Sequence, residues 1–169
     1  DKSDVILVTG GAKGLGAKTA IHLAKQHQCG LVLTGRSEAA DSLEIAETLK
    51  AIGTETDSIV FDNYGDDRWS GVTLDNASDE TTFEYVRLSG AQKGEGGGMY
   101  VNGSNPTLTH VTISGNTAGY GGGMYLSGSD PTLTHVTIVD NTADSGGGMY
   151  LDASNPTLTN SILWNNSPG

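Results

Sequence analysis

The stretch with the clearest chemical signature is the glycine-rich turn TGGAKGLG, which spans residues 9–16. Gly10 permits a tight turn, Gly14 lets backbone approach a pyrophosphate, and Gly16 lets a following helix pack against a strand. The first N–H groups of that helix would bind an anion. Arg36 stands where an acidic residue selects NAD, and a cation there suits the 2′-phosphate of NADP. The turn therefore predicts a site that can hold NADP weakly, formed by Thr9, Gly10, Gly11, Lys13, Gly14, Leu15, Gly16, Arg36 and Ser37.

The segments around this turn alternate between strand and helix patterns. Residues 4–10 (DVILVTG) and 30–37 (GLVLTGRS) contain short apolar runs of the kind that form buried strands. Apolar residues at helical spacing predict helices over residues 15–28 (LGAKTAIHLAKQHQ) and 41–53 (DSLEIAETLKAIG). The order strand, helix, strand, helix predicts the beginning of a doubly wound α/β unit, a partial Rossmann-like segment.

The sequences ILVTGGAKGLGAKTAIHLAK and LVLTGRSE resemble the ketoreductase domains of polyketide and polyunsaturated-fatty-acid synthases, in the short-chain dehydrogenase/reductase family. The resemblance covers residues 4–52 and implies a Rossmann fold, NADPH as cofactor and reduction of a β-keto group. The family's catalytic Tyr-x-x-x-Lys is absent, because no tyrosine is followed four positions later by lysine. We therefore expect no ketoreductase activity, and we assign no catalytic residue. An NADPH-dependent ketoreductase fragment and a purely structural α/β fragment stay open as alternatives.

A 25-residue repeat organises the rest of the chain. Its copies begin at Gly96 (GGGMYVNGSNPTLTHVTISGNT), Gly121 and Gly146, and a diverged copy spans residues 70–92. The β-type segments within each copy are too short for helices, and the fixed period indicates a solenoid of roughly four to five coils. Stacked asparagines are expected at Asn116, Asn141 and Asn166. The predicted interior is lined by Met99, Val101 and their copies, and by Leu108, Val111, Ile113, Leu133, Val136, Ile138, Leu158 and Ile162.

These repeats resemble right-handed parallel β-helix proteins of bacterial surfaces and secretions, through the pattern GG-x-[IM]-Y … N over residues 51–169. Some such proteins cleave or bind polysaccharide, and others are adhesins or spacers. We assign domains to residues 1–52 and 53–169, although residues 43–62 fit either part. The chain reads as a fusion or chimera, natural or engineered. Its predicted function is a non-catalytic structural or interaction module, with the reductase-like segment as an N-terminal cap and a polysaccharide or another protein as partner.

Three features of residues 51–169 could bind a ligand or a metal ion. Aromatic side chains recur at one position, in Tyr100, Tyr125 and Tyr150. Such a column can stack on sugars or serve the structure alone. His110 and His135 lie one repeat apart, but two histidines without a further ligand do not make a metal site. The loop DNYGDD at residues 62–67 is either a calcium site or a solvated acidic loop. We assign no metal.

The charge and composition of the chain disfavour several classes of binding partner. The net charge of −11 disfavours nucleic acid. No apolar run approaches the length of a membrane-spanning helix. Residues 94–169 contain no lysine or arginine, so they cannot supply the basic residue of a polysaccharide lyase. Location stays undetermined, since the β-helix favours secretion or the cell surface and the reductase-like part favours the cytoplasm. An open strand edge after the last repeat predicts end-to-end self-association.

Overall fold

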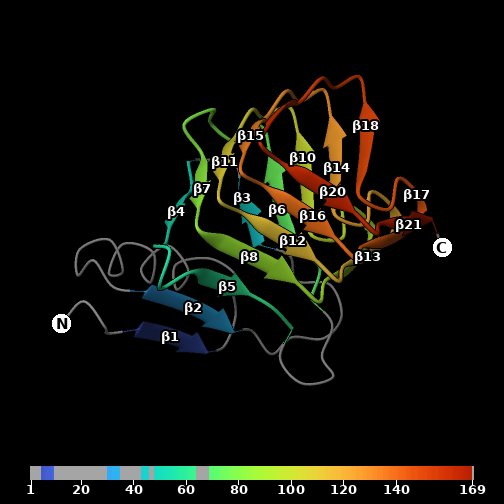
Figure 1. Ribbon diagram of the computed structural model, residues 1–169. Helices are drawn as coiled ribbons and strands as arrows, with labels where there is room; N and C mark the ends of the chain where they lie inside the picture. The colour runs from blue at the N-terminus through green and yellow to red at the C-terminus, as the bar shows by residue number, and fades with distance from the viewer. Residues whose placement is uncertain (1–4, 10–29, 35–42, 46–47, 64–68, 169) are drawn as a thin grey trace.

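The computed structural model describes residues 5–9, 30–34, 43–45, 48–63 and 69–168 of the 169-residue chain. Every regular element within these ranges is a β-strand, and no helix that could span a membrane occurs among them. The described residues from 43 onward form successive coils, and each coil contributes short strands to several parallel sheets (Figure 1). The predicted β-solenoid is therefore confirmed.

Four sheets form the walls of this solenoid. Sheet 1 contains β3 (Leu43–Ile45), β6 (Val72–Asp75), β10 (Met99–Asn102), β14 (Met124–Ser127) and β18 (Met149–Asp152). Sheet 2 contains β4 (Lys50–Ile52), β7 (Thr82–Glu84), β11 (Thr107–Thr109), β15 (Thr132–Thr134) and β19 (Thr157–Thr159). Sheet 3 contains β5 (Ile59–Phe61), β8 (Val86–Ser89), β12 (Thr112–Ser114), β16 (Thr137–Val139) and β20 (Ile162–Trp164). Sheet 4 contains β9 (Gln92–Glu95), β13 (Thr117–Tyr120), β17 (Thr142–Ser145) and β21 (Ser167–Pro168). We number the coils one to five by their strand in sheet 1.

The strand register reproduces the repeat of the sequence. Met99 lies opposite Met124, and Tyr100 lies opposite Tyr125, so residues 25 positions apart are neighbours in adjacent coils. Val72 lies opposite Met99, which confirms that residues 70–92 are a diverged copy. Parallel pairing in this register stacks each side chain on its own counterpart.

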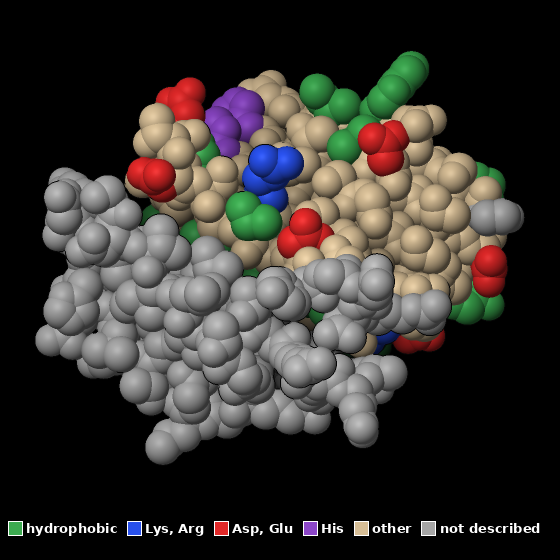
Figure 2. All heavy atoms as spheres, turned by 90° about the horizontal axis from the view of Figure 1, so that it is seen from below, with side chains coloured by type: hydrophobic (Ala, Val, Ile, Leu, Met, Phe, Trp, Pro, Cys, Tyr) green, Lys and Arg blue, Asp and Glu red, His purple; other side chains and the backbone are tan. Residues whose placement is uncertain are grey.

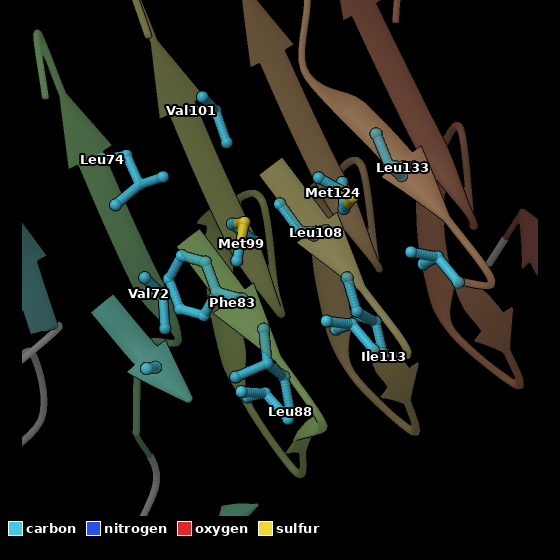
Figure 3. Packing of buried hydrophobic residues seen from close by; sticks show 14 of the residues in the cluster. Val72, Leu74, Phe83, Leu88, Met99, Val101, Leu108, Ile113, Met124 and Leu133 are labelled. Carbon is cyan, nitrogen blue, oxygen red and sulfur yellow. The ribbon is translucent and has the colours of Figure 1, made fainter. Parts of the chain in front are cut away.

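The core consists of the alternate side chains that point inward from sheets 1, 2 and 3 (Figure 3). In β10, Met99 and Val101 are fully buried and Tyr100 between them points outward, which is the two-residue period of a strand. Phe83 fills the interior of the second coil, where the later coils carry leucine. Other fully buried members include Leu74, Leu88, Leu108, Ile113, Met124, Leu126, Leu133 and Ile138.

The prediction that Ile162 lines the interior is wrong. Ile162 lies opposite Thr137 and is 57% exposed, and the inward position opposite Ile138 belongs to Leu163. A shift of one residue reverses which side of a strand a side chain occupies. The fifth copy reads SILW where the fourth reads VTIV, so its isoleucine stands one residue before the inward position that Ile138 holds in the fourth copy. Leu158 keeps its inward register but is 40% exposed in the fifth coil.

A ladder of asparagines crosses the buried turn between sheets 3 and 4, as predicted. The side-chain amide of Asn116 donates to Oδ1 of Asn141 at 2.9 Å, and that of Asn141 donates to Oδ1 of Asn166 at 3.0 Å. Each amide also reaches back to a carbonyl of the preceding coil; the Asn141 amide donates to the Ile113 oxygen at 2.9 Å. Full hydrogen bonding lets Asn116 and Asn141 be completely buried.

A second ladder, which the sequence analysis did not identify, joins serines at the turn between sheets 1 and 2. The Ser104 N–H donates to Oγ of Ser129 at 3.1 Å, and the Ser129 N–H donates to Oγ of Ser154 at 3.0 Å. The Ser129 hydroxyl donates in turn to the Ser127 carbonyl at 2.8 Å. Two opposite turns of the coil are thus fixed by polar side chains.

The first coil includes residues for which a helix was predicted. Instead of a helix over residues 41–53, the structure has β3 paired with β6 and β4 paired with β7. Ala51 is buried whereas Ile52 is 56% exposed, which is a strand period. Strand pairing with the second coil overrides the weak helical preference of the segment. The predicted helix over residues 41–53 is therefore wrong, and the boundary between residues 1–52 and 53–169 stays a prediction.

The N-terminal segment contributes two described strands. β1 (Val5–Thr9) and β2 (Gly30–Thr34) pair in parallel and occur where strands were predicted. β2 lies beside β5 of the first coil (Figure 1). Residues 10–29, which include the first predicted helix, lie outside the described residues, so the Rossmann-like segment stays a prediction.

Candidate ligand-binding groove

A column of tyrosines runs along the outer surface of sheet 1. Because Tyr100, Tyr125 and Tyr150 occupy the second position of successive strands, parallel pairing brings them into line. The ring centroids are 5.2 Å apart at both steps, with interplanar angles of 16° and 15°. The faces of the rings therefore stack on neighbouring rings. A ligand at the side of the column would contact ring edges and hydroxyl groups.

Lys93 closes the column at the second coil. Thr73 occupies the position that tyrosine holds in later coils, and a gap would otherwise lie beneath the Tyr100 ring. The Lys93 ammonium lies 5.1 Å from the centroid of that ring and donates to Oγ1 of Thr73 at 2.6 Å. A cation over an aromatic face is stabilising. The lower face of the column is thus covered by a fixed charge.

A groove lies beside the column, between sheets 1 and 4. It is open to solvent, has a volume of about 470 Å³, and lies within the size range of ligand sites. Tyr120, at the end of β13, is 46% exposed and meets Tyr150 edge to face at 5.2 Å. We call this feature the tyrosine groove; its lining residues are Thr73, Lys93, Gly94, Glu95, Tyr100 and Tyr120.

Negative charge surrounds the groove. Burial raises the pKa of Tyr100 above its ordinary value, and the carboxylates of Glu95, Asp75 and Asp152 raise it further. The pKa of Tyr125 is also raised, by burial and then by Glu95 and Asp152. Carboxylates that hold tyrosines neutral also repel anionic ligands. The groove is therefore suited to uncharged or cationic molecules.

The lining combines residues that recur with residues that do not. Glu95, Tyr120 and Ser145 occupy one position in three successive coils. A position that takes three different side chains is not required for coil stacking, so it is free to serve a ligand. The sequence analysis identified the recurring Tyr100 but missed Thr73, Lys93, Glu95 and Tyr120. The position of Glu95 and Tyr120 differs from copy to copy although the tyrosine position is constant, and this difference could have indicated a ligand site.

The two predicted histidines also form a column, at the corner between sheets 2 and 3. His110 and His135 stack at 4.7 Å with Tyr85 below His110 at the same distance. Figure 2 shows the two described histidines side by side at the surface. The next position is Asn160, whose Nδ2 lies 3.3 Å from Nε2 of His135. Parallel rings direct their nitrogen lone pairs side by side, which does not surround a metal, and no group of three metal-ligating side chains occurs among the described residues.

The carboxylates of the later coils serve the turns. Oδ1 of Asp130 accepts from the Asn155 N–H at 2.6 Å, and Oδ1 of Asp140 accepts from the Asn165 amide at 2.6 Å. These contacts link each aspartate to the next coil. Such aspartates hold backbone, and they are not arranged as a pair around a common ligand.

The predicted NADP site is described only at one residue. Thr9 ends β1. Gly10, Gly11, Lys13, Gly14, Leu15, Gly16, Arg36 and Ser37 lie outside the described residues. In the acidic loop at residues 62–67, only Asp62 and Asn63 are described; the Asn63 N–H donates to Oδ1 of Asp62 at 2.8 Å. Neither site is tested by the geometry.

Comparison with protein families agrees with both resemblances. A profile described as a right handed beta helix region matches residues 50–169. A second profile, described as a KR domain, matches residues 5–77. The two matches share residues 50–77, where the coils begin. No curated protein and no solved structure matches the chain.

Proposed function

Because the chain belongs to the right handed beta helix family, we propose that it is a non-catalytic binding module that holds a neutral glycan in the tyrosine groove. The observation that carries this proposal is the exposed Tyr120 beside an array of polar groups. A sugar ring has apolar C–H faces that pack on an aromatic ring, and hydroxyl groups that need hydrogen-bond partners. Glu95 and Tyr100 line the groove and supply such partners.

Charge selects among glycans. Glu95, Asp75 and Asp152 act on the tyrosines of the column, and they would equally oppose the carboxylates of uronic acids or the sulfates of sulfated sugars. Lys93 offsets this field only in part, because its single positive charge stands against three carboxylates. We therefore expect neutral oligosaccharides to bind more tightly than anionic ones.

A binding role without hydrolysis follows from the lining. Glycoside hydrolases commonly place two carboxyl groups on either side of the scissile bond. Among the described residues that line the groove, Glu95 is the carboxylate. The groove thus offers recognition groups without an acid and base pair.

Isothermal titration with neutral and anionic oligosaccharides tests the proposal. We expect binding of a neutral oligosaccharide that is weakened by Tyr120→Ala. Trp164→Ala is the matched control, because Trp164 is 71% exposed on sheet 3, away from the groove. Equal affinity in wild type and Tyr120→Ala, or binding of anionic sugars alone, would contradict it.

The N-terminal segment supports a second candidate function, because the KR profile includes β1, β2 and the glycine-rich turn. We infer weak binding of NADP, on the order of 0.1–1 mM at best, since half a Rossmann unit contacts only part of the cofactor. Arg36→Ala should remove a preference for NADP over NAD. Micromolar affinity would favour the ketoreductase alternative; no thermal shift at millimolar cofactor would exclude the site.

We infer that the same segment acts as an N-terminal cap. β2 lies beside β5, at the strand edge of the first coil. Covering such an edge prevents pairing with other chains. Removal of residues 1–42 should therefore increase aggregation of the β-helix, and a fully soluble truncated chain would argue against capping.

A further inference from the structure

The outer surface of sheet 2 carries a regular array of threonines that has no part in the tyrosine groove. Strands β11, β15 and β19 each read Thr-Leu-Thr, with leucine inward and both threonines outward. The register places equivalent threonines directly opposite one another in the third, fourth and fifth coils. We call these six residues the threonine array: Thr107, Thr109, Thr132, Thr134, Thr157 and Thr159.

The spacing of this array is set by β-geometry. Neighbouring strands lie about 4.8 Å apart, and alternate residues of one strand lie about 6.7 Å apart. Threonine is stiff at χ1, so its hydroxyl and methyl groups hold their positions. The third to fifth coils therefore present a two-dimensional lattice of hydroxyl and methyl groups.

The hydroxyl groups of the array are not used within the protein. None of the six makes a side-chain hydrogen bond to another described residue. At the turns, by contrast, some outward polar side chains are bonded between coils; the Asn105 and Asp130 oxygens each accept from a backbone N–H of the next coil. The array thus presents hydroxyl groups that have no partner among the described residues.

The nature of the surface argues against a protein partner. Energetically dominant contacts in protein interfaces come mainly from Trp, Tyr and Arg. On sheet 2 the outward positions of the last three coils hold threonine alone, and charged side chains occur only nearer the N-terminus, at Lys50 and Glu84. The tyrosine groove, where a small ligand would fit, is lined by residues of sheets 1 and 4 instead. A ligand that matches the regular spacing of the threonine array must itself have a regularly spaced surface.

Ordered water supplies such a surface. Tetrahedral water molecules joined by O–H···O bonds of about 2.75 Å place second-neighbour oxygens about 4.5 Å apart. In hexagonal stacking of those tetrahedra the perpendicular repeat is about 7.3 Å by the same bond length. The array differs from these spacings by about 0.3 Å per coil and about 0.6 Å along the strand. Over three coils the drift is about 0.6 Å, close to the spread of about 0.5 Å in O–H···O distances.

From this match, we propose that the threonine array of sheet 2 binds the surface of ice. The hydroxyl groups take the places of lattice oxygens, and the methyl groups lie between them against the spaces of the lattice. Adsorbed protein then hinders addition of water to the crystal. This site is independent of the tyrosine groove, which lies between sheets 1 and 4.

Ice itself is the probe. The full 169-residue chain should slow ice recrystallisation and separate the freezing point from the melting point, and both effects should be lost in Thr132→Tyr, which obstructs the centre of the array. Thr137→Tyr is the matched control, since Thr137 lies outward in the same coil but on sheet 3. Thr137→Tyr and Tyr120→Ala should keep full activity, so this proposal and the glycan site fail separately.

Folding of the variants is checked by urea unfolding. If Thr132→Tyr does not fold, Thr157→Tyr replaces it, because Thr157 is exposed in the fifth coil and a larger side chain is accommodated there. This variant should lose part of the effect on ice growth. Absence of any effect of wild type on ice growth would overturn the proposal, and so would equal loss in Thr132→Tyr and Thr137→Tyr. Retention on crystalline cellulose without any effect on ice would show that the array recognises polysaccharide instead.

Discussion

Asn141 joins three coils through one side chain. Its Oδ1 accepts from the Asn116 N–H and side-chain amide, and its own amide donates to Asn166 and to the Ile113 carbonyl. The side chain is completely buried, so every group left unpaired after its removal would stay away from water. The residue is therefore a sensitive test of the ladder.

Replacement of Asn141 by leucine should lower the free energy of unfolding by roughly 1–3 kcal/mol, which is the usual penalty of unsatisfied buried groups. Asn166→Leu should have a smaller effect, because Asn166 is only half buried in the fifth coil. Urea unfolding followed by circular dichroism measures both values. Equal midpoints for the two variants would show that the ladder does not depend on burial.

The tyrosine column makes stability depend on pH at the alkaline end. Burial, Glu95 and Asp75 raise the pKa of Tyr100 in the folded state, so folding favours the protonated phenol. That contribution is complete below the unfolded value of about 10 and is lost as pH rises through the higher folded value. Unfolding free energy should therefore fall above pH 10.

The Tyr100→Phe variant should lose less stability than wild type over the same alkaline range, because phenylalanine keeps the stacked ring and cannot ionise. Phenolate absorbance during titration reports the ionisation directly, and urea midpoints report stability. Wild type and Tyr100→Phe with identical pH dependence would mean that Tyr100 ionises equally well in folded and unfolded chains.

At the level of elements, three consecutive glycines at residues 96–98, 121–123 and 146–148 explain how sheet 4 passes into sheet 1. A Cβ on Gly122 would lie 2.5 Å from the Gly147 carbonyl oxygen and 2.5 Å from the Thr142 carbonyl oxygen. Both obstacles are backbone, and they belong to the next coil and its neighbouring strand, so no side-chain rotation relieves them. Glycine is required there because the coils approach more closely than a Cβ allows.

Gly122→Ala should therefore destabilise more strongly than Gly128→Ala. Gly128 has a φ of 52° but open space where its Cβ would lie, so alanine there meets only the left-handed backbone penalty of about 1–2 kcal/mol. Urea unfolding of the two variants compares close contact with backbone strain. Equal destabilisation would indicate that the coils separate easily at Gly122.

The 25-residue repeat made the solenoid predictable from the sequence, but the first and last coils were not predicted correctly. Met99 and Met124, or Asn116 and Asn141, recur at a fixed step, so their stacking follows once a coil has 25 residues. Ile162 was misplaced because SILW offers three apolar residues in a row, and the strand register decides that Leu163 points inward. Residues 41–53 were misassigned because their apolar spacing fits both periods, and pairing with β6 and β7 selects the strand.

The groove was less predictable than the fold. Tyr100 was visible as a recurring aromatic residue, but Lys93 and Tyr120 lie at positions where the copies differ. Lys93 reaches Tyr100 only because sheet 4 folds beside sheet 1. Contacts between different sheets of one coil have no periodic signature, so the sequence alone did not reveal them.

At the scale of the whole molecule, the two ends of the solenoid differ. β2 lies beside the first coil, whereas inward positions of the fifth coil are open to solvent. Leu151 is 49% exposed and Leu163 is 45% exposed, although their counterparts in the fourth coil are fully buried. Strands β18 to β20 also present an unpaired edge within the described residues. Apolar surface combined with a free edge favours pairing with another chain.

We therefore expect the 169-residue chain to self-associate through its fifth coil as concentration rises. Leu163→Lys places a charge at the centre of that surface and should shift the population toward monomer, because association would bury an unpaired ammonium. Ile52→Lys is the control, since Ile52 is also exposed, at 56%, but on the outside of the first coil. Sedimentation velocity over a range of concentrations measures the distribution, and urea unfolding shows that both variants stay folded. A monomeric wild type at high concentration, or the same loss of association in Ile52→Lys, would mean that the fifth coil does not mediate contact between chains.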